Sequence, residues 1–151
     1  LLGAWNVHSP DYITQEKIKF HPTARRYEPG VLNASGIVGL KAVLELISEF
    51  GIENISSQLL KLKFYLINKL ESLGFIINGP RAGQNASSIT TFKPLTENAL
   101  AIFDKLNNSG IICSCRKDRS GEQFLRFSPH FYNTETEIDR VMDILARGTN
   151  S

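Results

Sequence analysis

Arg126 lies in a short apolar run and is the residue best suited to bind an anion. The run 124–128 reads Phe-Leu-Arg-Phe-Ser, so a strand there would place Leu125 and Phe127 on one face and Arg126 on the other. If helices cover the Leu125 face, Arg126 points away from the core. A guanidinium binds a carboxylate through two parallel hydrogen bonds, which suits recognition of an amino or keto acid. On the strand pattern alone, an exposed arginine that keeps a sheet face soluble is the simpler interpretation.

The two cysteines, Cys113 and Cys115, form a Cys-x-Cys pair. On a strand both thiols would point to the same face, and the extended backbone disfavours a disulfide between them. No second cysteine pair or nearby histidine completes a zinc site. We therefore expect two reduced thiols and no metal.

The stretch 24–40 is predicted to be a loop that becomes a helix. Pro29 and Gly30 mark a turn, and Asn33, or Ser35 two residues later, can cap the backbone N–H groups of the helix that follows. A helix N-terminus is also a natural place for an anion. Capping alone does not indicate whether a phosphate binds there.

Hydrophobic periodicity predicts helices that end near glycine residues. The last one begins with Thr134 and Glu137 in a Thr-x-x-Glu capping box, and the third is expected to be capped by Thr96. The lysines at 61, 63 and 69 are expected on the solvated side of the second helix. The predicted helices are 34–50, 53–73, 97–109 and 135–147, and the glycines are Gly51, Gly74, Gly110 and Gly148.

Strands are predicted between these helices, with a polar turn at 117–121 joining the last two into a hairpin. The element order predicts an α+β domain, in which a small, largely antiparallel sheet has helices packed on one face. Residues 1–33 are interpreted as an irregular interdomain arm and residues 34–151 as the domain. The predicted strands are 75–78, 87–92, 111–116 and 124–128.

The composition is that of an ordinary soluble domain. The chain has 151 residues, 42% of them hydrophobic and 21% charged, with a net charge of +2. This near balance argues against nucleic acid or an anionic membrane as a partner, and no apolar stretch approaches the length of a bilayer span. Without a signal peptide pattern, we expect a cytoplasmic protein.

Two motifs resemble the C-terminal small domain of class V aminotransferase-type enzymes. One is the segment 24–40, Ala-Arg-Arg-Tyr-Glu-Pro-Gly-Val-Leu-Asn-Ala-Ser-Gly-Ile-Val-Gly-Leu, preceded by Trp5, Val7 and Pro10. The other is 125–135, Leu-Arg-Phe-Ser-Pro-His-Phe-Tyr-Asn-Thr-Glu, which is similar to the family's closing motif: arginine on a strand, a Tyr-Asn-Thr turn, then the last helix.

The resemblance implies an enzyme that uses pyridoxal 5′-phosphate (PLP). The family's lysine that holds the cofactor lies upstream of these motifs, so no catalytic residue is expected in this chain, and the chain alone is expected to be inactive. The resemblance implies that Arg126 grips the carboxylate of an amino-acid substrate and that Asn33 is a weak candidate for the cofactor phosphate. It also implies an upstream large domain in the same polypeptide and a homodimer.

The sequence departs from the cysteine desulfurase branch of that family at two places. The family's Gly-Thr is replaced by Gly30 and Val31, which has no hydroxyl group to reach a phosphate. The stretch 113–118, Cys-Ser-Cys-Arg-Lys-Asp, lacks the Arg-x-Gly-His-His pattern that precedes the desulfurase nucleophile. Transamination, epimerisation and β-elimination remain open, and desulfuration is disfavoured. A free-standing α+β binding or regulatory domain without catalysis is the alternative.

Overall fold

The computed structural model of the chain describes residues 19–28 and 30–147. The chain divides into two compact units, Leu1–Glu49 and Phe50–Ser151. The motif residues Trp5, Val7 and Pro10, and the expected helix-ending Gly148, lie outside the described residues. The predicted boundary between an arm and a domain at residue 33 stays a prediction.

The first unit contains a single turn of 3-10 helix, η1 (Ala24–Tyr27), and nearly all of α1 (Ala34–Phe50). Helix α1 has the predicted bounds. The Asn33 side-chain oxygen Oδ1 accepts a hydrogen bond from the backbone N–H of Gly36 at 3.0 Å and from the Ser35 hydroxyl at 3.1 Å. Every residue of α1 is described and none of them is buried.

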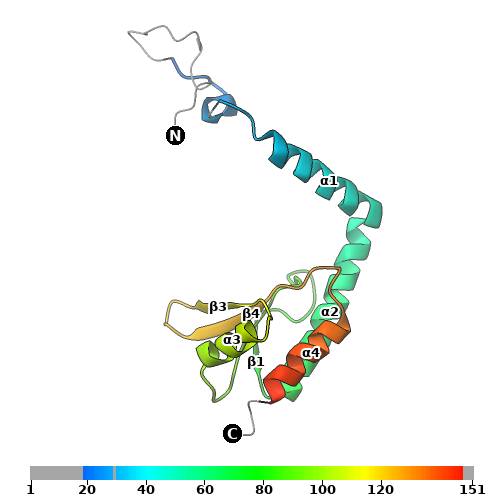
Figure 1. Cartoon of the computed structure of the whole chain (residues 1–151), viewed down its shortest axis with the longest axis vertical. Helices are drawn as coiled ribbons and strands as arrows, with labels where there is room; N and C mark the ends of the chain where they lie inside the picture. The colour runs from blue at the N-terminus through cyan, green and yellow to red at the C-terminus, as the bar shows by residue number, and fades with distance from the viewer. Residues whose placement is uncertain (1–18, 29, 148–151) are drawn as a thin grey trace. The chain divides into compact units, whose positions relative to one another are not determined.

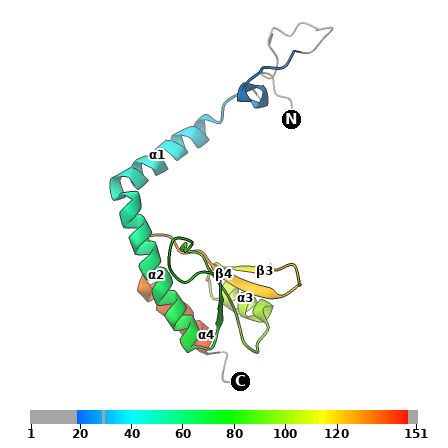
Figure 2. The same cartoon turned by 180° about the vertical axis from the view of Figure 1, so that it is seen from behind.

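The second unit is a four-stranded sheet with helices on one face, which confirms the predicted α+β class (Figures 1 and 2). The strand order is β1-β2-β4-β3, and every neighbouring pair is antiparallel. Helix α3 connects β2 to β3, between which β4 is inserted. The elements are α2 (Ile52–Ser72), β1 (Ile76–Asn78), β2 (Thr90–Lys93), α3 (Ala99–Asn108), β3 (Ser114–Lys117), β4 (Gln123–Phe127) and α4 (Glu135–Ala146).

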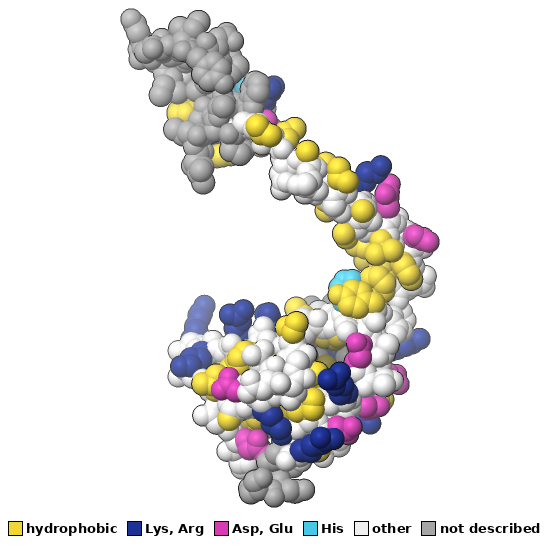
Figure 3. Space-filling view, viewed as in Figure 1, with side chains coloured by type: hydrophobic (Ala, Val, Ile, Leu, Met, Phe, Trp, Pro, Cys, Tyr) yellow, Lys and Arg dark blue, Asp and Glu magenta, His cyan; other side chains and the backbone are white. Residues whose placement is uncertain are grey.

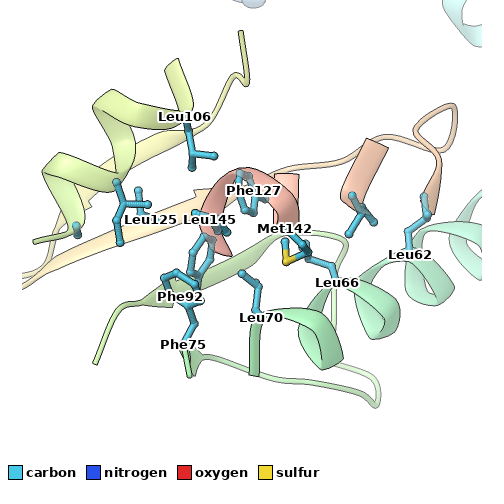
Figure 4. Packing of buried hydrophobic residues seen from close by; sticks show 13 residues of the cluster. Leu62, Leu66, Leu70, Phe75, Phe92, Leu106, Leu125, Phe127, Met142 and Leu145 are labelled. Carbon is cyan, nitrogen blue, oxygen red and sulfur yellow. The ribbon is translucent and has the colours of Figure 1, made fainter. Parts of the chain in front are cut away.

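The core lies between the sheet and the three helices (Figure 4). Phe92 and Leu125 are fully buried at the centre of the sheet and lie opposite each other across β2 and β4. Each of these side chains stabilises the fold by roughly 1.5–3 kcal/mol through removal of apolar surface from water. The helices contribute side chains at intervals of three and four residues: Leu62, Leu66 and Leu70 from α2, Ala99, Ile102 and Leu106 from α3, and Ile138, Met142 and Leu145 from α4.

Two helices end in the same glycine motif, which turns the chain back toward the core. Gly74 and Gly110 have φ angles of 83° and 75°, a left-handed conformation that glycine adopts without strain. The next residue then donates its N–H to the carbonyl group five residues earlier, Phe75 to Leu70 at 3.0 Å and Ile111 to Leu106 at 2.9 Å. Both of these residues pack on the core. The predicted role of these two glycines is confirmed.

The predicted cap is right for α4 and wrong for α3. Thr134 and Glu137 form the full capping box at the start of α4, as expected. The predicted cap of α3 at Thr96 is wrong, because Asn98 directly precedes the helix and its Oδ1 accepts the N–H of Leu100 at 2.8 Å.

Two predicted strands begin too early. The strand predicted at 87–92 is observed as Thr90–Lys93, because its neighbours in β1 and β4 pair only with residues 90–93. The strand predicted at 111–116 is observed as Ser114–Lys117. Ile111 cannot begin that strand because its N–H completes the end of α3.

A polar cluster on the outer surface joins α2 to α4. The Asp139 carboxylate accepts hydrogen bonds from the Tyr65 hydroxyl at 2.7 Å and from the Lys69 ammonium at 2.9 Å. These bonds, that from Lys69 above all, lower the pKa of Asp139, and the Asp139 bond raises the pKa of Lys69. The folded state therefore favours the ionised carboxylate.

We predict that Asp139→Asn lowers the free energy of unfolding at neutral pH. Because the folded-state pKa of Asp139 is depressed, its contribution is complete above the unfolded-state pKa of about 3.9 and is lost as pH falls through the folded-state pKa. The difference between the wild type and the variant should thus close in acid. Urea unfolding at pH 7 and at low pH measures this difference in the free energy of unfolding, with Asp143→Asn, one turn further along α4, as the control. A difference that persists unchanged in acid would contradict this assignment.

Candidate functional site

The face of the sheet without helices carries a row of polar side chains, one from each strand. Asn78 pairs with Thr91, Thr91 with Arg126, and Arg126 with Ser114. Directly opposed residues in an antiparallel sheet project to the same face, with Cβ atoms about 4.5–5.5 Å apart. The sheet therefore places Arg126 between two hydroxyl groups, on the face predicted for it.

The outward direction of this polar row follows from the row beside it, which is apolar and packs on the helices. Ile77, Phe92, Leu125 and Cys115 are in register with one another across the four strands. All four belong to the core or pack against it. Because side chains alternate along a strand, burial of this row forces the polar row outward.

Arg126 has few partners among the described residues. Its Nη2 donates to the Ser114 hydroxyl at 3.5 Å, a long hydrogen bond. Its Nε is buried and has no hydrogen-bond partner, and Arg126 forms no salt bridge with the described part of the chain. A buried cationic donor without a partner costs free energy, so this guanidinium retains capacity for an anionic ligand.

An aromatic and basic row lies next to the polar row on the same face. Phe124 faces this side and is 9% exposed, and the Lys93 ammonium lies 5.8 Å from the centre of its ring. Lys93 also forms an ion pair with Glu122. Arg116 pairs with Phe124 across β3 and β4 and is exposed. The surroundings of Arg126 thus combine an apolar surface with positive charge.

A depression of about 620 Å³ lies at one end of the sheet, beside the start of α3. Lys93, Lys117 and Glu122 contribute to its lining, and Arg126 does not. The candidate site in this chain is therefore an open sheet face rather than a closed cavity.

The cysteines lie on the opposite, helix-covered side. Cys115 is in the apolar row, and both sulfurs are reduced and pack against the core. Burial raises the pKa of the Cys113 thiol, and the neighbouring Cys115 raises it further. A nucleophilic thiolate needs an exposed, electropositive setting, which this is not.

Lys63 contradicts the sequence prediction. The helix pattern placed it on the solvated side of α2 with Lys61 and Lys69, but it is 4% exposed. Its ammonium donates to the backbone carbonyl of Ile89 at 2.9 Å, directly before β2, and burial lowers its pKa. The prediction failed because the loop between β1 and β2 covers this part of the helix, which no local pattern reveals.

Asn33, the weak candidate for a cofactor phosphate, is exposed at the N-terminus of α1. Its oxygen is occupied in capping, so its Nδ2 group is the donor that remains for an anion. It lies in the first unit, whereas Arg126 lies in the second.

The described residues, 19–28 and 30–147, contain no group of three or more histidine, cysteine or acidic side chains that could hold a metal ion. Within the same residues, no helix has both the length and the apolar character needed to cross a membrane.

A family model identifies the family to which the chain belongs. The family model described as aminotransferase class-V matches residues 3–141. The chain belongs to this family. The class V match is consistent with both motifs identified in the sequence.

The relatives that match this chain include cysteine desulfurases. The cysteine desulfurase of Escherichia coli strain K12 is 31% identical over 136 residues, which cover 81% of this chain and 32% of that protein. The chain therefore spans about a third of the length of the relatives it matches.

Solved structures show the same fold. A cysteine desulfurase from Thermococcus onnurineus NA1 superposes with a TM-score of 0.80 at 20% identity, covering 97% of this chain and 38% of that one. A cysteine desulfurase from Escherichia coli gives a TM-score of 0.79 at 22% identity, with 97% and 37% coverage. A cystine C-S lyase in complex with cysteine persulfide gives 0.71 at 19% identity, with 96% and 37% coverage.

We predict that changing Cys113 and Cys115 together to serine leaves most of the activity of the full-length enzyme intact. The reason is that both sulfurs pack on the helix-covered side and Cys113 resists ionisation. Loss of packed sulfur should lower the melting temperature modestly. Complete loss of turnover with cofactor binding and folding retained would show that one of these thiols is a nucleophile.

Proposed function

We propose that this chain is the C-terminal small domain of a longer PLP-dependent enzyme that acts on an amino acid. The class V match across residues 3–141 supports the family assignment, and the length of the relatives supports a longer polypeptide. In this proposal the missing two thirds supply the large domain and the lysine that holds the cofactor.

The main support for the proposal is that Arg126 has hydrogen-bonding capacity that the described residues do not use. It lies on the open face, its Nε is buried without a partner, and no described acidic residue neutralises it. A guanidinium in this state fits one or both oxygens of a substrate carboxylate. Arg126 is accordingly assigned to substrate binding, and Phe124, two residues away on the same face, provides apolar surface near it.

The described residues do not by themselves form a PLP site. When bound, this cofactor acts as an electron sink for carbanions. Of the residues expected to approach it, only Asn33 is present, and it offers one amide group. The buried Lys63 is held by the Ile89 carbonyl and is unsuited to a covalent link. The cofactor is therefore assigned to the upstream part of the protein, and no chemical step is assigned to this chain.

Helix α1 supports the presence of a covering domain. It exposes a series of large apolar side chains, as the yellow surface along it shows (Figure 3). Exposed apolar surface of this kind marks an interface. We assign it to the upstream large domain of the same polypeptide, in an enzyme that we expect to be cytoplasmic and homodimeric. The exposed residues are Ile37, Val38, Leu40, Val43, Leu44, Leu46 and Phe50.

The positions of the two cysteines bear on which reaction the proposed enzyme catalyses. The relatives are named cysteine desulfurases, but here the only thiols in the chain lie at 113 and 115 and pack on the core side. Transamination, epimerisation or β-elimination needs no thiol from this domain. These three reactions therefore fit the chain better than desulfuration.

The Arg126→Ala variant of the full-length enzyme tests the proposal. A charged hydrogen-bonding partner contributes roughly 1.5–3 kcal/mol, so kcat/KM should fall by about ten- to a hundredfold or more. Arg126→Lys should recover only part of the loss, because an ammonium group lacks the planar fork.

Arg116→Ala is the matched control, since it removes the same charge from the same sheet face. It should change kcat/KM far less than Arg126→Ala. The Arg126 variants should keep their thermal stability, because the side chain lies outside the core. Unchanged kcat/KM, or a large fall in melting temperature, would assign Arg126 a structural role instead.

The isolated chain is predicted to fold without binding the cofactor. Its second unit has a self-contained core, so thermal unfolding followed by circular dichroism should be cooperative. Addition of PLP should give no visible absorbance from a stoichiometric lysine adduct. A chain that forms such an adduct and turns over an amino acid would refute the assignment of the cofactor to the upstream domain.

A further inference from the structure

Ser114 is the only side chain that forms a hydrogen bond with Arg126 among the residues the structure describes. It lies directly opposite Arg126 in the pairing of β3 with β4. Thr91 lies opposite Arg126 on the other side, in β2, and forms no such bond there. The guanidinium is therefore held from one side only.

Contact at one edge determines where the other N–H groups point. A guanidinium is planar and carries five N–H donors in fixed directions. The bond from Nη2 to the Ser114 hydroxyl therefore restricts the orientation of the unpartnered Nε as well. At 3.5 Å the bond is longer than the usual 2.7–3.2 Å, so it is weak and leaves the guanidinium able to bind an anion.

The chemistry of the Ser114 side chain matters as much as its position. A hydroxyl oxygen accepts a hydrogen bond without neutralising the positive charge. An aspartate in the same place would form an ion pair with Arg126 and compete with an incoming carboxylate. An alanine would remove this hydrogen bond and loosen the orientation of the guanidinium.

We propose that Ser114 is a positioning residue, which orients the Arg126 guanidinium for a substrate carboxylate. This inference rests on the proposed function of Arg126. It makes the pair Ser114 and Arg126, rather than the arginine alone, the unit that recognises the carboxylate.

The test is NMR of the full-length protein labelled with ¹⁵N-arginine, with acetate as the carboxylate probe. The Nε–H signal of Arg126 is identified as the one missing from Arg126→Lys. Ser114→Ala should weaken acetate binding by about threefold to tenfold, the effect of one weak hydrogen bond to a charged group. It should also lower the ¹H–¹⁵N heteronuclear NOE of that signal, because the guanidinium gains mobility.

Ser114→Thr keeps the hydroxyl and should restore both measurements, whereas Ser114→Asp should abolish acetate binding. Ser72→Ala, at the end of α2 and outside this sheet face, is the control and should leave both unchanged. If the wild type binds acetate at Arg126 and Ser114→Ala behaves identically, the positioning role is refuted and the proposed function stands. If acetate never shifts the wild-type signal, carboxylate binding by Arg126 fails, and this inference fails with it.

Discussion

Burial of one apolar row of the sheet determines the rest of the second unit. Phe92 and Leu125 are fully buried and lie at its centre, with Ile77 and Cys115 at its ends. Because strand side chains alternate, a shift of one residue would bury Arg126 in an apolar core, at a cost far above that of an ordinary surface change. The packing of three helices on this row therefore also fixes the register of the polar row on the other face.

The two faces of the sheet differ in what they present to other groups. One face is covered by helices and holds both thiols, while the other presents Arg126 with an unpaired donor. Helix α1 adds an apolar surface of the kind that proteins cover. Both features support the proposed role as one domain of a longer enzyme. The chain spans about a third of the length of the relatives it matches.

Local sequence signals were sufficient for much of this fold. The Thr134 and Glu137 capping box, and the glycines after α2 and α3, depend on contacts within a few residues and were predicted correctly. The alternation of side chains along residues 124–128 also predicted the sheet face on which Arg126 lies. The hairpin register could have revealed Ser114, since the turn at 117–121 fixes which residues of its two strands oppose each other.

Other features depend on contacts between distant segments and could not be predicted. The burial of Lys63 arises from the loop that precedes β2, 26 residues further along the chain. The place of Thr91 and Asn78 beside Arg126 requires the strand order β1-β2-β4-β3, which no short pattern specifies. The late starts of β2 and β3 likewise reflect the length of their partners and the end of α3.

The most direct test of the account is a crystal structure of the full-length enzyme with a bound amino acid. The ligand carboxylate should lie on the open sheet face, with its oxygens about 2.7–2.9 Å from the Arg126 guanidinium nitrogens. A carboxylate held by other residues, with Arg126 paired to an acidic side chain of the protein, would contradict it.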